Sequence, residues 1–153
     1  MSFEKNVTGS GIVCYYDNRN SSVNELESDI LFLCLIDYEN LYDIPKGTID
    51  EGETFLNCAI RETYEESGLE YTDFTKISDH YAHFGQSMVT FLGNLKVEVL
   101  LNKSIFIKPN PKTKIIEHKG FRFLSLKNIL NKTPDYLKEV FTYYDNFIRE
   151  ENV

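Results

Sequence analysis

The stretch "IPKGTIDEGETFLNCAIRETYEESGLE", Ile44 to Glu70, carries seven acidic residues against two basic ones. Its second half has the spacing of a helix, with Thr54 suited to the N-cap and Gly68 to the position just past the C-terminus. On such a helix one face is mostly apolar, and it is formed by Phe55, Leu56, Ala59, Ile60 and Thr63.

Three glutamates crowd onto another side of the same helix. Glu62, Glu65 and Glu66 stand at i, i+3 and i+4, so their carboxylates lie within an arc of roughly 100°. Like charges at this spacing destabilise a helix by roughly 0.2–0.5 kcal/mol per pair, and only Arg61 offers a compensating charge. Helix stability therefore does not explain the pattern. A divalent cation such as Mg²⁺ does, because it prefers oxygen ligands, activates water and offsets the charge of a phosphate substrate.

The stretch resembles the Nudix box, G-x5-E-x7-R-E-U-x-E-E-x-G-U, in which U is a bulky apolar residue. The positions that match in register are Gly47, Glu53, Arg61, Glu62, Glu65, Glu66, Gly68 and Leu69. Thr63 is the one departure, since it occupies the first apolar position. A chance match of seven fixed residues is expected on the order of once per million chains of this size, so the resemblance is specific.

The resemblance implies an α+β protein with the Nudix fold, an α/β/α sandwich in which the box forms a loop–helix–loop beside a mixed sheet. It also implies hydrolysis of a diphosphate linkage, with Mg²⁺ as cofactor or Mn²⁺ in its place. By position, Glu62, Glu65, Glu66 and the Gly47 carbonyl resemble metal ligands. Arg61 resembles the orienting cation, with Glu53 as its partner. Either Glu62 or Glu66 would take the proton from the attacking water.

Three further features resemble the asymmetric diadenosine tetraphosphate hydrolases. They are "PKG" before the helix, Thr63 within it, and "EHKGFRFLSL" downstream, which implies that Glu117 is a further metal ligand. The predicted substrate contacts are Lys46, Tyr81, Lys114 and Tyr136. This resemblance implies cleavage of diadenosine tetraphosphate to ATP and AMP. The segment "KSIFIKPNPKTK" makes the chain longer here than those hydrolases.

Two other functions stay open. "PKG" and "CAIRETYEE" also resemble messenger-RNA decapping enzymes, and "IDEGET" resembles bacterial RNA pyrophosphohydrolases. Either implies an RNA 5′ end as substrate, in place of a dinucleoside polyphosphate or another nucleoside diphosphate derivative. The third function is a non-catalytic nucleotide-binding Nudix module, although such modules usually lack a box glutamate and this chain has all of them.

The bulk properties fit one folded domain over residues 1–153. The net charge of −8 disfavours general nucleic-acid binding, yet seven Lys and Arg residues against one acid lie between Leu101 and Lys127. That basic segment either contacts phosphates or is an ordinary solvated loop. No stretch is apolar enough to span a membrane or serve as a secretory signal, and the three cysteines fit reduced core thiols. We therefore expect a cytoplasmic protein; its oligomeric state is not predicted.

The coarse pattern predicts elements in the order β-β-α-β-β-β-α. Strands are expected in "GSGIVCYY", "DILFLCLI", "SMVTFLGNLKVEVL", "KSIFIK" and "GFRFLSL", with a bulge or turn at Gly93-Asn94. A final helix would be capped by Thr133, with Pro134 in its first position. Its apolar stripe would contain Leu137, Val140, Phe141, Tyr144, Phe147 and Ile148.

Overall fold

A computed structural model describes residues 7–20, 26–84, 87–102 and 105–151. Its strands are β1 (Gly9–Asp17), β2 (Ile30–Ile36), β3 (Tyr42–Asp43), β4 (Lys46–Thr48), β5 (Phe74–Phe84), β6 (Met88–Leu95) and β7 (Gly120–Leu124). Its α-helices are α1 (Phe55–Ser67), α2 (Val97–Asn102), α3 (Leu126–Ile129) and α4 (Asp135–Glu150). Two single 3₁₀ turns, η2 (Tyr71–Asp73) and η3 (Leu130–Lys132), precede β5 and α4.

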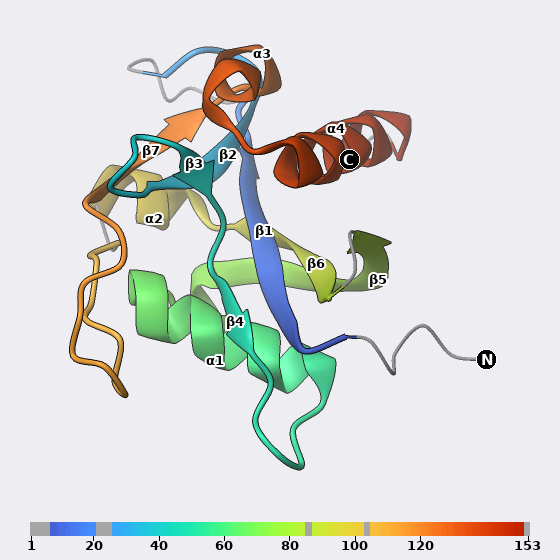
Figure 1. The fold of residues 1–153 in the computed structure, drawn as a ribbon. Helices are drawn as coiled ribbons and strands as arrows, with labels where there is room; N and C mark the ends of the chain where they lie inside the picture. Colours follow the sequence, from blue (N-terminus) through green and yellow to red (C-terminus); the bar gives the residue numbers. More distant parts are fainter. Residues whose placement is uncertain (1–6, 21–25, 85–86, 103–104, 152–153) are drawn as a thin grey trace.

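The seven strands form one mixed sheet with β1 at its centre (Figure 1). Along one edge β1 pairs in parallel with β6, which in turn pairs with β5. Along its other edge β1 pairs antiparallel with β4 through Gly9–Gly11 and with β2 through Tyr15–Asp17. The strands β3 and β7 extend the sheet by pairing with β2. This pairing brings β4, and with it the start of the acidic stretch, beside the first residues of β1.

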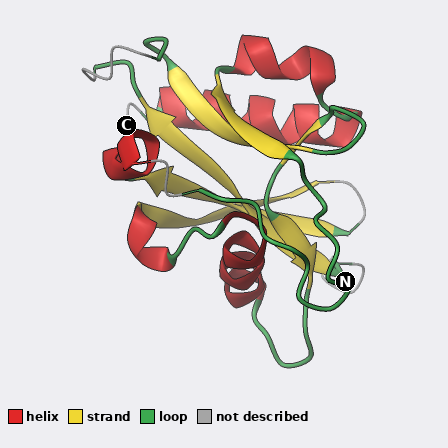
Figure 2. Ribbon diagram, turned by 90° about the vertical axis from the view of Figure 1, so that its left-hand side faces the viewer, coloured by secondary structure: helices red, strands yellow, loops and turns green. Residues whose placement is uncertain are grey.

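Helices cover both faces of the sheet, so the predicted three-layer sandwich is confirmed (Figure 2). Side chains of successive residues in β1 and β2 point to opposite faces and enter two separate cores. One core joins Val13 and Phe32 to α4, and the other joins Ile12 and Leu33 to α1. The edge of the sheet between α1 and the start of α4 is where the candidate site lies.

The helix α1 begins and ends where the sequence predicts. The Thr54 hydroxyl accepts a hydrogen bond from the Asn57 amide at 3.1 Å, and Gly68 takes the left-handed conformation with φ 77°. Its buried face differs in part from the prediction, because Cys58 and Ser67 are buried whereas Leu56 is 36% exposed. The thiol of Cys58, like those of the two other cysteines, is free and buried, as expected.

The predicted cap of α4 is wrong. Thr133 uses its hydroxyl to donate to the Ile129 carbonyl at 2.6 Å, which closes the preceding turn. Pro134 precedes the helix, and Asp135 is its first residue. The apolar stripe is confirmed, since Leu137, Val140, Phe141, Tyr144 and Ile148 are buried and Phe147 packs against them.

The predicted element order is incomplete. The sequence reading missed β3, β4 and β5, and it assigned "VEVL" to a strand although these residues form α2. There tertiary packing overrides β-propensity, because α2 buries Val99 against the α1-side core. The described part of "KSIFIK" forms no strand; Phe106 instead donates its amide to the Ser67 carbonyl at 3.1 Å. At Gly93-Asn94, where a bulge or turn is predicted, β6 continues without a turn. The irregularity lies in the partner strand, where the register of β5 shifts between Phe74 and Lys76.

We expect Gly93→Ala to destabilise the fold by ~1–3 kcal/mol, the usual penalty of overpacking a core. An added Cβ would stand 2.5 Å from a Phe74 ring carbon and 2.8 Å from Cγ2 of Ile12. Gly120→Ala is the matched control, since its nearest neighbour, Cδ1 of Ile36, would be 3.9 Å away. Urea unfolding measures both variants. Equal destabilisation by the two would contradict the packing described for the sheet.

Candidate active site

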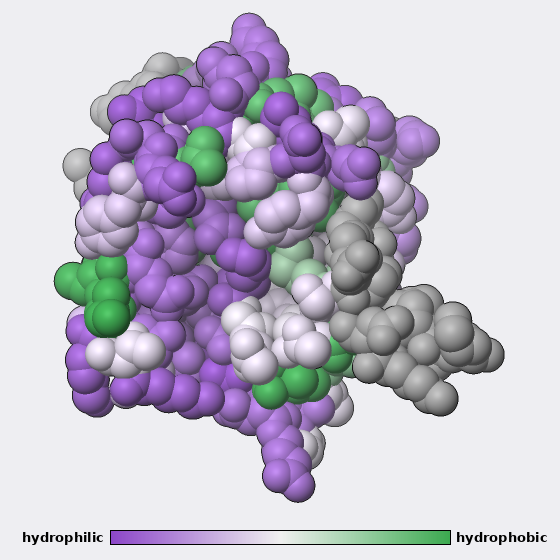
Figure 3. Space-filling model, viewed as in Figure 1, coloured by the Kyte–Doolittle hydropathy of each residue, from purple (hydrophilic) through white to green (hydrophobic). Residues whose placement is uncertain are grey.

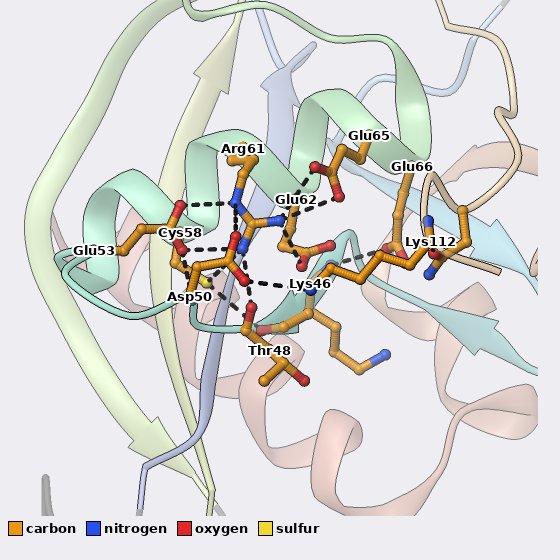
Figure 4. Close-up of polar contacts among 12 residues, drawn as sticks. Lys46, Thr48, Asp50, Glu53, Cys58, Arg61, Glu62, Glu65, Glu66 and Lys112 are labelled. Carbon is orange, nitrogen blue, oxygen red and sulfur yellow. Dashed lines mark hydrogen bonds and ion pairs between the residues drawn. The ribbon is translucent and has the colours of Figure 1, made fainter.

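A single guanidinium organises the acidic stretch (Figure 4). Arg61 donates to Glu53 at 2.7 and 3.0 Å and to the Thr48 carbonyl at 2.9 Å. It also donates to Glu62 at 3.1 Å and to both carboxylate oxygens of Glu65 at 3.2 Å. The hydrogen bond from Arg61 holds the pKa of Glu53 below its usual range. Arg61 and Glu53 therefore lie together as predicted, and they join the loop before α1 to the acidic face.

The glycine that opens the box lies directly against a carboxylate. A Cβ added at Gly47, on β4, would overlap the Glu62 carboxylate, so a larger residue there would push this carboxylate out of its place. The Cys58 thiol donates to the Gly47 carbonyl at 3.7 Å. The backbone of Gly47, from β4, and the carboxylate of Glu62, from α1, therefore lie next to each other.

Glu66 is the most deeply placed of the three helix glutamates. Its carboxylate accepts a hydrogen bond from the Lys46 amide at 3.0 Å. Burial raises the pKa of Glu66 to about 7, although that hydrogen bond and the charges of His118 and Lys46 oppose the rise. Burial also raises the pKa of Glu62, against the charge of Arg61. Both carboxylates resist ionisation here, and a bound cation would favour their charged forms.

Asp43 is a functional candidate that the sequence reading missed. It accepts hydrogen bonds from the Lys46 ammonium at 2.7 and 2.8 Å and from Nε2 of His118 at 3.0 Å. Burial would raise the pKa of Asp43, but the hydrogen bond from His118 and the charge of Lys46 outweigh it and lower that pKa. The one sequence feature that could have indicated Asp43 is its position just before "PKG". A single aspartate in a two-residue strand, however, belongs to no recognisable sequence motif. Lys46, a predicted substrate cation, is thereby already paired.

A cleft of about 480 Å³ lies beside these groups. Lys46, Gly47, Glu66, Glu117 and Tyr136 all line it, as the sequence reading required, and Asp43 and His118 complete its polar side. In Figure 3 hydrophilic side chains dominate the left and centre of this face. The remaining lining residues are Thr8, Gly9, Ser10, Thr48, Ser87 and Met88.

Two predicted substrate contacts lie away from this cleft. Tyr81 is 42% exposed on β5, where its ring packs against Phe91. Lys114 is exposed in the loop before β7, in a left-handed conformation with φ 65°. Glu117 does line the cleft, and its carboxylate accepts a hydrogen bond from the side-chain amide of Asn110 at 2.7 Å.

The donor set fits a hard divalent cation, because every candidate ligand is a carboxylate or carbonyl oxygen. The close approach of Glu62 to Gly47 and the buried Glu66 carboxylate would each favour such an ion. In the described conformation no three His, Cys, Asp or Glu side chains of residues 7–20, 26–84, 87–102 and 105–151 converge in a geometry for metal binding. Arg61 instead contacts two of the carboxylates. Binding by Gly47, Glu62, Glu65, Glu66 and Glu117 would supply charge neutralisation and water activation here.

The sequence model of the NUDIX domain matches residues 24–142. The chain belongs to the Nudix family. The RNA pyrophosphohydrolase of Helicobacter pylori strain P12 is 32% identical in a match 130 positions long that covers 76% of this chain and 79% of that enzyme. The RNA pyrophosphohydrolase of Campylobacter jejuni strain RM1221 is 26% identical over 145 residues, covering 86% of this chain and 88% of the enzyme.

Solved structures share the fold. A binary complex of the Caenorhabditis elegans Ap4A hydrolase superimposes with a TM-score of 0.68 at 20% identity, covering 94% of this chain and 98% of that one. The predictions of a Nudix fold and of a pyrophosphohydrolase are confirmed. Members of the family act on nucleotide derivatives and generally use divalent cations. No helix among the described residues is long and apolar enough to cross a membrane.

The buried Glu66 carboxylate predicts how metal-free stability depends on pH. A folded pKa of about 7 lies above the ordinary value near 4.3, so the stabilisation is complete below about pH 4.3 and is lost as pH rises through 7. This loss is on the order of 3 kcal/mol. In EDTA, Glu66→Gln should therefore match wild type near pH 4.5 and exceed it in melting temperature at pH 8.

The control for that comparison is Glu139→Gln, an exposed glutamate on α4. It should follow the wild-type melting temperature at every pH. A Glu66→Gln difference that stayed constant from pH 4.5 to 8 would contradict the burial of an ionisable carboxylate at this position.

Proposed function

We propose that this enzyme hydrolyses the triphosphate at the 5′ end of RNA, leaving a 5′-monophosphate. The observation that carries the proposal is the similarity to the Helicobacter pylori RNA pyrophosphohydrolase, at 32% identity over 76% of this chain and 79% of that enzyme. The Ap4A hydrolase structures are near 20% identity and share the fold alone. RNA therefore replaces the dinucleotide as the first candidate.

The cleft suits a nucleotide that carries a polyphosphate. Tyr136, 40% exposed at the start of α4, offers a ring on which the first base stacks. Glu66, Gly47 and Glu117 line the same cleft, where the anhydride bond would meet Mg²⁺, or Mn²⁺ in its place. One of Glu62 and Glu66 takes the proton from the attacking water. Arg61 keeps Glu62 and Glu65 oriented on one face of α1.

Diadenosine tetraphosphate is the second candidate, favoured by the exposed aromatic ring of Tyr136 at the rim of the cleft. Base stacking contributes roughly 1–3 kcal/mol and does not depend on whether an RNA chain follows. Binding one adenosine there would fix which phosphorus is attacked, giving ATP and AMP. Two ADP molecules would contradict that geometry.

Residues 1–153 would act as a single Nudix domain in the cytoplasm under this proposal. Catalysis is favoured over a purely nucleotide-binding role because the box has all of its glutamates, and three of them, Glu62, Glu65 and Glu66, lie together on α1. The test is therefore a turnover measurement with a matched variant series.

A 5′-triphosphorylated oligoribonucleotide and diadenosine tetraphosphate are incubated separately with the enzyme and Mg²⁺. We expect 5′-monophosphorylated RNA and a higher kcat/KM for RNA than for the dinucleotide. Glu66→Gln should lower kcat by at least ~100-fold. Loss of a residue that merely supports a metal ligand costs about 10–100-fold, and loss of a ligand itself should cost no less. Glu65→Gln should lower it less, and Glu139→Gln should leave it unchanged.

A higher kcat/KM for the dinucleotide would move the proposal to the second candidate. Absence of turnover on both substrates, with a folded protein and saturating Mg²⁺, would contradict a role on either. Full activity of Glu66→Gln would contradict a catalytic or metal-binding role for the Glu66 carboxylate.

A further inference from the structure

Residues 105–119 cross from α2 to β7 and contain a turn with its own internal order, the 108–117 hairpin. Pro109 and Ile116 form a bridge between its two arms. Asn110 holds the turn, because its amide donates to the Ile115 carbonyl at 2.8 Å and its side-chain oxygen accepts two backbone N–H groups. Most of the hairpin falls in the stretch that the sequence predicts to be longer than in the diadenosine tetraphosphate hydrolases, and of its residues only Glu117 lines the cleft.

Two lysines of the 108–117 hairpin reach back to the acidic stretch. The Lys108 ammonium stands 3.8 Å from the ring centroid of Tyr64, on α1. Lys112 lies 3.4 Å from Asp50, in the loop before α1, and Figure 4 shows its side chain running along the acidic face. The hairpin therefore touches the helix on one side and the loop before it on the other.

The space between hairpin and helix is narrow and is lined by charges of both signs. Glu62, Glu65 and Glu66 line it from the helix, and the other side is lined by Lys108, Asn110, Pro111, Glu117 and His118. The cavity between them is about 10 Å³, about the minimum for one water. A phosphate bound at the acidic face would therefore displace the hairpin while remaining beside its lysines.

Both lysine contacts are of a kind that exchanges easily. The Lys112 and Asp50 side chains are 76% and 45% exposed, and exposed ion pairs contribute little to stability. Tyr64 is itself 43% exposed, so its cation–π contact with Lys108 is also at the weak end of the range. For Lys108 a phosphate would replace the contact with the Tyr64 ring by a charge-assisted hydrogen bond, and for Lys112 it would replace one charge-assisted partner by another.

We propose that the 108–117 hairpin is a phosphate-binding element, in which Lys108 and Lys112 bind the terminal phosphate of the group that is released. Lys112 exchanges Asp50 for phosphate, and Lys108 approaches from above Tyr64. On RNA this is the outermost, γ phosphate, which makes the hairpin a determinant of preference for a triphosphorylated over a diphosphorylated 5′ end. The inference rests on the proposed pyrophosphohydrolase function and extends it to substrate selection.

The test compares Lys108→Gln and Lys112→Gln on RNA with a 5′ triphosphate and on the same RNA with a 5′ diphosphate. Each variant should lower kcat/KM about tenfold on the triphosphate, the loss of one charge-assisted hydrogen bond. On the diphosphate each should change it by less than about threefold. Lys132→Gln, an exposed lysine of η3, is the control of equal charge and should alter neither.

The diphosphorylated RNA separates phosphate binding from mere stabilisation of the closed hairpin. If the ion pair between Lys112 and Asp50 only holds the hairpin in place, Lys112→Gln should lower kcat/KM on the triphosphate and on the diphosphate alike, and the proposal fails. Binding of inorganic tripolyphosphate, followed by thermal shift, should weaken in both lysine variants and remain unchanged in Lys132→Gln.

The failure of this inference is distinct from that of the proposed function. An active wild-type enzyme whose lysine variants keep the same preference between the two RNA ends would overturn the role of the hairpin alone. A wild-type enzyme that spares RNA but cleaves diadenosine tetraphosphate would overturn the RNA proposal, and the tripolyphosphate measurement would still test the hairpin.

Discussion

The contact between Arg61 and four surrounding carboxylates is the constraint on which the rest of the site depends. Glu53, Glu62 and Glu65 accept hydrogen bonds from the guanidinium, and Asp50 lies 3.5 Å from it. Arg61 together with Lys112, which contacts Asp50, supplies two positive charges for these four carboxylates and leaves the region negative. Arginine suits this position because its planar donors reach several acceptors at once while its charge is permanent. The residual negative charge is what makes divalent cations the natural partners of this face.

The sheet supplies the second half of the arrangement. Pairing of β4 with β1 fixes the backbone of Lys46–Thr48, so that the Lys46 amide meets Glu66 and Gly47 lies under Glu62. The helix cannot turn about its axis without breaking these contacts, because α1 also packs its opposite side into the core. A helix and a short strand are therefore held as one rigid unit, and rigidity of this kind is what positions ligands within fractions of an ångström.

Much of this arrangement was predictable because the information is local. The caps of α1 depend on Thr54 and Gly68 alone, and the common face of the glutamates follows from helical periodicity. The close approach of Gly47 to Glu62 was available only through the resemblance to the Nudix box. The polar partner Asp43 was not predictable, since it meets His118 across 75 residues of sequence.

The failures share a cause, which is tertiary contact that outweighs local preference. "VEVL" alternates like a strand but forms α2 because Val99 is needed in the core. Thr133 resembles a helix cap, yet a backbone carbonyl one turn earlier takes its hydroxyl. The basic segment stands out in the sequence, but its lysine count does not predict that Lys108 lies over Tyr64 and Lys112 beside Asp50. Those contacts depend on how residues 105–119 return across α1.

The central claim is that the acidic face of α1 holds divalent cations, and diffraction at the manganese edge from crystals soaked in Mn²⁺ tests it most directly. The account predicts anomalous peaks bounded by the Gly47 carbonyl and the carboxylates of Glu62, Glu65 and Glu66, with the bond from Arg61 to Glu62 lengthened or broken. Peaks elsewhere, with every Arg61 contact unchanged at saturating Mn²⁺, would contradict it.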